Sequence, residues 1–157
     1  MTANAAEPTA PGGGGALTGA RGKALLTAVI LSGLLIVGIW VAFLFAGHGV
    51  FGLNHHNLTA DKHQLGDQKV LDAHRAIGSI LQVVALLLLI AVAIARPVRS
   101  LIIWTVVLAV LIIVGQPLLA GIGEDHSWVG GLHVLDGGII LVLSFYVHLA
   151  LRKVPRA

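Results

Sequence analysis

The sequence predicts an all-α integral membrane protein that folds as a four-helix bundle. Hydrophobic residues make up 57% of the 157 residues, and the mean hydropathy of +0.93 is typical of membrane proteins rather than soluble domains. Four apolar stretches without Lys or Arg each reach the roughly 20 residues that a spanning helix needs. They cover about residues 24–46, 76–95, 101–122 and 129–151. These spans and their loops use up the chain, which leaves no room for a soluble domain.

The N-terminal segment differs in composition from the spans. Residues 1–20 are rich in Ala, Gly, Pro and Thr, which predicts a disordered cytoplasmic tail before a four-helix transmembrane domain at 21–157. The apolar run at 24–46 is longer than the core of a signal peptide, and three further spans follow it. We therefore expect a retained first helix.

The distribution of basic residues predicts the topology. Seven of the ten Lys and Arg residues fall on one side of the predicted membrane: Arg21, Lys23, Arg96, Arg99, Arg152, Lys153 and Arg156. Only Lys62, Lys69 and Arg75 fall on the other, among several acidic residues. Because cytoplasmic loops carry the excess of basic residues, both termini are predicted to be cytoplasmic in a bacterial inner membrane, an N-in/C-in arrangement. Placed in this way, the net charge of +3 does not indicate nucleic-acid binding.

Turn and cap residues predict the helix ends. A long outer loop is expected over about Gly47–Asp67, with Asp67 capping a second helix that runs from about Gln68 to Ala95. The pair Arg96-Pro97 ends that helix and leaves a short inner turn. Pro117 is expected to kink the third helix and free a carbonyl, and Gly121–Ser127 forms the second outer loop, with Ser127 as a cap.

The pattern HxxxG occurs twice, beginning at His74 and at His133 and ending at Gly78 and Gly137. Residues four apart share one face of a helix, so each Gly lies one turn beyond its His. An imidazole beside a surface without a side chain suits a flat macrocycle, because the imidazole supplies an axial ligand and the Gly leaves room for the ring. Counted from the predicted caps, both histidines lie roughly 10 Å below the outer helix ends. The pattern predicts a b-type haem between His74 and His133; the alternative is a pair of histidines that only form hydrogen bonds across the bundle.

Three further residues extend this hypothesis. Arg75 near the outer surface is a candidate partner for a haem propionate, or else an anchor that reaches the interface. Asp136 is a candidate acceptor for an imidazole N–H, or a partner of Arg75. His148 lies on a similar face to His133, about 22 Å deeper, where the second helix offers only Leu87–Leu89. We therefore expect no second haem.

The remaining candidates are few. Absence of cysteine excludes disulfides, thiol catalysis and iron–sulfur clusters. Histidines and carboxylates gather in the outer loops, where the alternatives are a copper or zinc site and an exposed polar loop: His48, His55, His56, Asp61, His63, Asp67 and His126. No nucleophile–base set or phosphate loop is present in the sequence.

Four helices, with His74-Arg75 on the second and His133 on the fourth, resemble one half of haem A synthase over about residues 24–151. The resemblance implies a haem held by this His pair. The family carries a functional Glu three residues before the first His, where this chain has Leu71, with Asp72 one place closer. The second four-helix half is also missing, which favours a non-catalytic protein. The chain is also similar to small uncharacterised bacterial four-helix membrane proteins with an HxxxG motif.

Two functions from different classes remain open at this point. The first is a protein that binds one haem b near the outer face, for electron transfer or haem handling. The second is a non-catalytic accessory subunit of a membrane complex without a cofactor. In both cases we expect contact with the lipid bilayer, with a membrane-complex partner or a second copy as the other candidate contact, and no nucleic acid.

Overall fold

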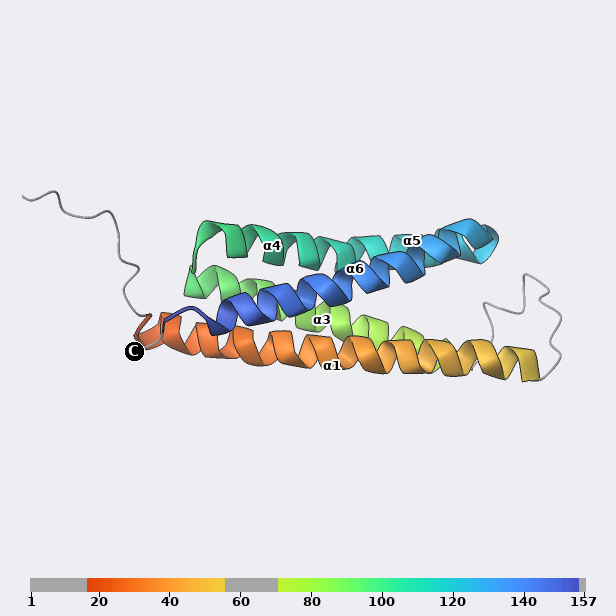
Figure 1. The fold of residues 1–157 in the computed structure, drawn as a ribbon, viewed down its shortest axis with the longest axis horizontal. Helices are drawn as coiled ribbons and strands as arrows, with labels where there is room; N and C mark the ends of the chain where they lie inside the picture. Colours follow the sequence, from red (N-terminus) through yellow and green to blue (C-terminus); the bar gives the residue numbers. More distant parts are fainter. Residues whose placement is uncertain (1–16, 56–70, 156–157) are drawn as a thin grey trace, which may run out of the picture.

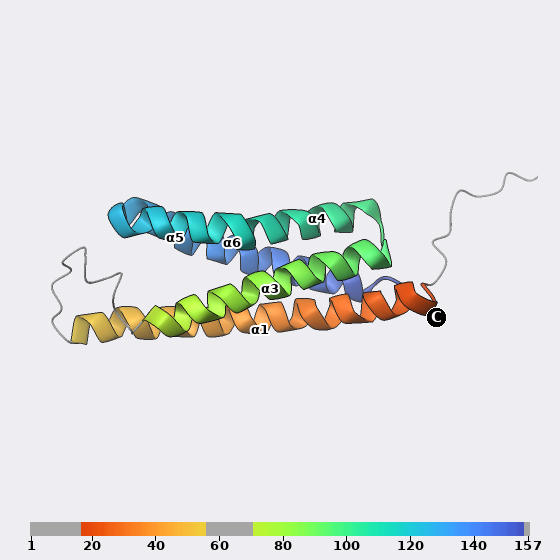
Figure 2. The ribbon, with the colours of Figure 1, turned by 180° about the vertical axis from the view of Figure 1, so that it is seen from behind.

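The computed structural model describes residues 17–55 and 71–155, and these form four long helices. The first is α1 (Gly19–His55) and the second is α3 (Asp72–Ala95). The third is built from α4 (Arg99–Val110), a π-helical turn η2 (Leu111–Gly115) and α5 (Gln116–Asp125). The fourth is α6 (Ser127–Arg152), and Figures 1 and 2 show all four running alongside one another. The predicted all-α four-helix bundle is confirmed.

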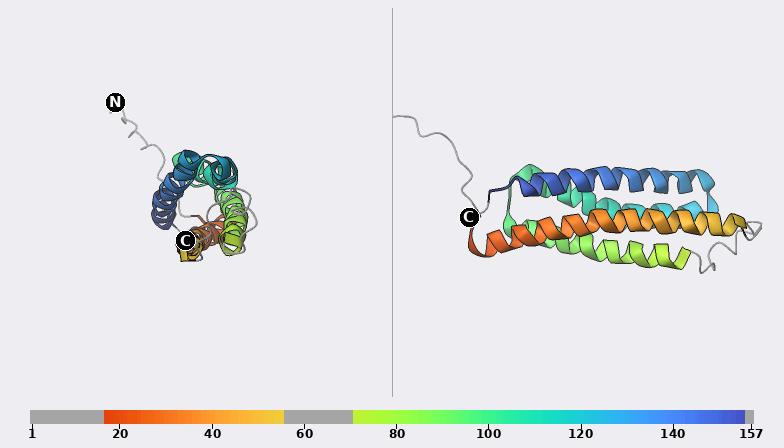
Figure 3. Two further views of the ribbon diagram at one scale, coloured as in Figure 1. Left: turned by 90° about the vertical axis from the view of Figure 1, so that its right-hand side faces the viewer. Right: turned by 60° about the horizontal axis from the view of Figure 1, so that its bottom comes forward.

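The helices form a ring in the order α1, α3, α4–α5 and α6 (Figure 3, left), which places α3 and α6 on opposite sides. No Cα atom of α3 lies within 8 Å of a Cα atom of α6, as expected for opposite members of a ring. At one end of the bundle the amide of Leu17 donates a hydrogen bond to the carbonyl of Pro155 at 3.1 Å. We call this the terminal end, and the end with Asp72, Asp125 and Ser127 the histidine end. Both ends of the described chain therefore lie on the same side of the bundle.

All four helices are long and apolar enough to cross a membrane, over Gly19–Gly49, Asp72–Ala95, Arg99–Asp125 and Ser127–Arg152. Large apolar side chains also point outward on each of them, among them Leu44, Ile80, Val114 and Val142. A soluble monomer rarely exposes apolar surface on this scale, whereas a lipid environment favours it. This is the architecture of a multi-pass membrane protein.

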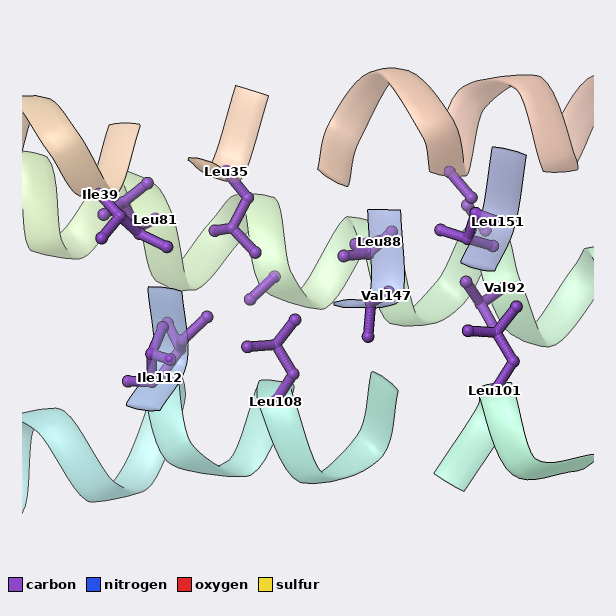
Figure 4. Packing of buried hydrophobic residues seen from close by; sticks show 14 of the residues in the cluster. Leu35, Ile39, Leu81, Leu88, Val92, Leu101, Leu108, Ile112, Val147 and Leu151 are labelled. Carbon is purple, nitrogen blue, oxygen red and sulfur yellow. The ribbon is translucent and has the colours of Figure 1, made fainter. Parts of the chain in front are cut away.

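The packed core fills the bundle toward the terminal end. Leu88 of α3, Leu108 of α4 and Val147 of α6 are each at most 1% exposed and meet on the bundle axis (Figure 4). Buried hydroxyls in this region are satisfied locally: Thr105 and Ser144 donate to the carbonyls of Leu101 and Ile140, one turn back. In lipid an unpaired polar group is costly, so this bonding lets the polar residues remain in the core.

Small residues bring α1 close to α3, and also to α6, which carries His148. A Cβ atom at Gly38 would collide with the side chain of Leu81, and a Cβ at Gly33 would lie 3.6 Å from Cε1 of His148. Ala85 and Ala91 of α3 are almost fully buried. Close van der Waals contact drives helix association in membranes, and these residues permit it.

Several predicted helix ends are wrong. The helix α1 continues to His55, so the segment from Gly47 to His55 is helical rather than loop. The predicted loop Gly121–Ser127 is also mostly helix: α5 ends at Asp125, the N-cap of α6 is His126, and Ser127 is the first helical residue. The helices extend into the predicted loop because α5 and α6 pack closely at this hairpin. A Cβ at Gly123 would lie only 3.0 Å from backbone atoms of Gly130.

Two other local predictions have clear outcomes. The helix α3 ends at Ala95 as predicted, and Arg96 adopts a left-handed conformation with φ 48° before Pro97. At Pro117 the helix continues, but the preceding turn widens, and the amide of Gln116 donates to the carbonyl of Leu111. Of the predicted disordered tail at 1–20, residues 1–16 lie outside the described residues, whereas Leu17 is hydrogen-bonded to Pro155 and α1 begins at Gly19. The proposed cap Asp67 also lies outside the described residues.

Candidate ligand-binding site between the paired histidines

His74 and His133 meet in the centre of the bundle near the histidine end. His74 lies in the first turn of α3 and His133 in the second turn of α6. The two histidines are therefore not equally far from the starts of their helices, contrary to the count from the predicted caps. In space the two levels still match, because the ring centres are 6.2 Å apart and the ring planes are 80° apart. Two opposite helices of the ring therefore present their imidazoles to one another.

Each imidazole is oriented by a main-chain carbonyl. Nδ1 of His74 lies 2.9 Å from the carbonyl oxygen of Ala42 on α1, and Nδ1 of His133 lies 3.2 Å from that of Gln116 on α5. A carbonyl only accepts, so the ring must donate, and each Nδ1 carries the hydrogen. In a neutral imidazole this leaves Nε2 with a lone pair, which is the form that binds a metal. Within residues 17–55 and 71–155 no hydrogen bond engages either Nε2.

The two halves of the bundle repeat this arrangement. In both hairpins the histidine on the second helix donates to a carbonyl of the first helix, α3 to α1 and α6 to α5. The two HxxxG patterns therefore share a contact to the hairpin partner as well as a sequence motif.

A buried polar network supports His133. Nε2 of Gln116 donates to Oδ2 of Asp136 at 2.8 Å and to the carbonyl of His133 at 3.1 Å. Asp136 is only 8% exposed, so its carboxyl group depends on this donor. The partner of Asp136 is therefore Gln116, rather than an imidazole or Arg75.

A cavity of about 880 Å³ surrounds the histidine pair and is lined by all four helices of the bundle. Its volume falls in the range of cofactor sites. Gly78 lines it, and a Cβ there would meet nothing within 4 Å. Gly137 also lines it, but its missing side chain makes room for the ring of Phe43, whose Cε1 would lie 3.1 Å from a Cβ. The lining is mostly apolar. Besides the two histidines, its polar residues are Arg75, Ser79, Gln82, Gln116 and Glu124.

Arg75 lies at the rim of the cavity toward the histidine end. Its guanidinium is 3.7 Å from the carboxylate of Asp72 on its own helix and 3.5 Å from that of Glu124 on α5. The second contact joins two helices whose Cα atoms nowhere come within 8 Å of one another. All three side chains are partly exposed, so the pairs hold α3 and α5 together only weakly.

The other histidines lie apart from this pair. Nδ1 of His148 is 2.9 Å from the hydroxyl of Ser32 in the half of the bundle toward the terminal end. His48 and His126 are exposed near the histidine end, whereas His56, Asp61, His63 and Asp67 lie outside the described residues and the side chain of His55 is not described. In the described part of the chain, no three or more His, Asp or Glu residues form a group that would hold a metal ion.

No protein-family model, curated protein or solved structure matches this chain. The site must therefore be interpreted from its own geometry. Sequence reasoning located His74, His133 and the two glycines, but it assigned no role to Gln116, Phe43 or Glu124. The polar residue before Pro117 was the available signal for Gln116, since an amide in a span needs a partner.

Proposed function

We propose that this membrane protein binds one b-type haem between His74 and His133, near the histidine end of the bundle. The observation that carries the proposal is the ring separation of 6.2 Å with both Nδ1 atoms already bonded to carbonyls. His74 and His133 would hold the iron between them, and their ring separation leaves room for metal–nitrogen bonds of about 2.0–2.1 Å to the two imidazoles. Perpendicular ring planes are compatible with this, because each ring can rotate about its own metal–nitrogen axis.

The surroundings of the pair fit the rest of a haem. The cavity is mostly apolar, and Gly78 leaves room beside His74 for the edge of a ring. Arg75 at the rim supplies a cation for a carboxylate substituent. Bound there, a haem would add one-electron chemistry, whose potential depends on the axial ligands and the burial of the ring. The chain's own residues hold the ring, keep both imidazoles in one tautomer and exclude water.

The test is an absorption spectrum of the full chain, purified in detergent after reconstitution with haem, with and without dithionite. We expect a low-spin spectrum with a reduced α-band. His74→Ala and His133→Ala should each abolish it, because both axial bonds are needed.

His148→Ala is the matched control, since this histidine is bonded to Ser32 away from the cavity, and the low-spin spectrum should persist. A wild-type chain that stays colourless after reconstitution would reject haem binding. The accessory-subunit hypothesis would then be preferred, and co-purification of a membrane partner would be its next test.

A further inference from the structure

The cavity around the histidine pair has an opening on one side of the bundle. Along the ring, α3 approaches α1, α4 and η2, but none of its Cα atoms comes within 8 Å of α5. Figures 1 and 2 show the reason, since α3 crosses from α4 at the terminal end to α1 at the histidine end and diverges from α5. The backbones of the third helix and α3 therefore come close only along the part nearer the terminal end, whereas at the histidine end the Arg75–Glu124 ion pair spans the wider gap.

Residues on either side of this gap line the cavity and are also exposed on the outer surface of the bundle. Ser79 of α3, with Pro117 and Ala120 of α5, line the cavity and are also exposed on the bundle. All three are uncharged and none has a large side chain. From Arg75 to Gln82 the gap extends seven residues, or roughly 10 Å along the helix. Because the outer surface of the bundle faces lipid, this opening faces the bilayer.

Described residues form three other boundaries of the cavity. Toward the terminal end, Leu81, Ile112 and Ile140 form a floor and are each at most 9% exposed. Between α1 and α6 the ring of Phe43 fills the space over Gly137. At the histidine end of the gap, Arg75 and Glu124 form an ion pair across it.

We propose that this opening is a lateral passage through which the site exchanges an amphiphilic, planar, dicarboxylic ligand with the bilayer, with the Arg75–Glu124 pair separating as the ligand moves. This inference rests on the proposed haem site and deepens it, because it identifies haem as an exchangeable cargo. The function at this site is then haem handling rather than electron transfer by a fixed group.

The chemistry of the ligand agrees with a sideways route. In a bilayer such an amphiphile holds its carboxylates at the interface and its apolar ring among the lipid chains. Lateral movement of the ligand from the bilayer into the cavity then brings its carboxylates to Arg75 and its ring to the histidines. The carboxylates stay at the interface and the ring stays in apolar surroundings throughout. By contrast, a dianion that approaches from water meets the carboxylates of Asp72 and Glu124 around Arg75 first.

The experiment follows haem transfer between haem-loaded vesicles and the apoprotein in proteoliposomes, by absorbance, in both directions. Ser79→Trp and Ala120→Trp fill the gap and should slow binding and release together, by roughly tenfold or more, as obstruction of a passage does. Val83→Trp on the lipid-facing side of α3, outside the cavity, is the matched control and should exchange at the wild-type rate.

A reversible block gives a second measurement. The chain has no cysteine, so the pair Ser79→Cys and Ala120→Cys can be bridged selectively by a cleavable bis-maleimide. Bridging after loading should trap the haem, and cleavage should restore exchange.

The possible outcomes separate the two proposals. If the wild type binds haem but the Trp variants and the bridged protein exchange it at the wild-type rate, the lateral passage is wrong and the haem site stands. The passage is equally wrong if Trp speeds release, since that would mean a lost binding contact. If the wild type binds no haem, both proposals fail.

Discussion

Two carbonyl oxygens, those of Ala42 and Gln116, orient the imidazoles of the candidate site. Both belong to helices that bear no motif of their own, and both belong to the hairpin partner of the helix that carries the histidine. A carbonyl that accepts from Nδ1 fixes the tautomer as well as the direction of the ring. Both Nε2 atoms therefore keep a lone pair. At the residue scale, the geometry of the candidate site depends on the positions of backbone carbonyls as well as on side-chain identity.

Gly78 and Gly138 offer a matched pair of substitutions. A Cβ at either position would meet nothing within 4 Å, but only Gly78 lines the cavity. Gly78→Leu should leave thermal stability unchanged or raise it by up to about 1 kcal/mol, since Leu is the better helix former. It should abolish haem absorbance, because the side chain occupies the ring position. Gly138→Leu should keep both stability and absorbance, and equal absorbance in the two variants would contradict the proposed position of the ring.

Gln116 and Asp136 should be energetically coupled. Gln116→Leu removes the donor of a buried carboxyl group and should cost about 1–3 kcal/mol of stability in detergent. Adding Asp136→Leu removes the unsatisfied group, so the double variant should be more stable than Gln116→Leu alone. Thermal unfolding of the two single variants and the double variant gives the coupling energy. Strict additivity would show that this hydrogen bond does not hold α5 against α6.

Among the elements, the third helix is the least regular, and it shapes the site. Its π-helical turn at Leu111–Gly115 precedes Gln116, whose carbonyl and amide both serve His133. Such turns are rare and frequently occur at functional sites. The divergence of α5 from α3 at the histidine end then gives the cavity its open side.

The contact between α1 and α3 should be the most sensitive to added volume. A Cβ at Gly38 already collides with Leu81, so Gly38→Leu should lower stability by roughly 1–3 kcal/mol, the usual cost of overpacking. Gly121→Leu is the control, because a Cβ at this exposed position meets nothing within 4 Å. Thermal unfolding in detergent measures both variants. An unchanged midpoint for Gly38→Leu would mean that α1 and α3 do not pack through this glycine.

The elements that could be predicted from sequence are those set by local rules. Hydropathy identified four spans, and Arg96-Pro97 marked the end of α3, because each signal is contained in a short segment. The predicted ends of α1 and α5 are wrong, because Gly and polar residues in a short segment favour the prediction of a loop. The last turns of α5 pack against α6 where Gly123 lies beside Gly130, and this contact exists only in the folded hairpin. The role of Gln116 could not be predicted for the same reason, because its partners His133 and Asp136 lie 17 and 20 residues away in the sequence.

Across the whole molecule, the packed core and the candidate site occupy different halves. Toward the terminal end the bundle is filled by Leu, Val and Ala, with Ser32 and His148 bonded to one another. Toward the histidine end the helices separate and enclose the cavity. A closely packed half thus adjoins a half that contains a cavity, and the same four helices form both.

The last prediction concerns the orientation of the whole bundle. Both described chain ends lie at the terminal end, which also carries Arg21, Arg96 and Arg152, whereas Asp72, Glu124 and Asp125 lie at the histidine end. By the positive-inside rule the terminal end should face the cytoplasm, which would place the candidate site toward the outer side. In a bacterial host, a green fluorescent protein fused after Ala157 should fluoresce, and an alkaline phosphatase at the same place should be inactive. The same phosphatase inserted after His126, in the short turn at the histidine end, should be active. An active C-terminal phosphatase would invert the topology and would place the candidate site, with its lateral opening, toward the cytoplasmic leaflet.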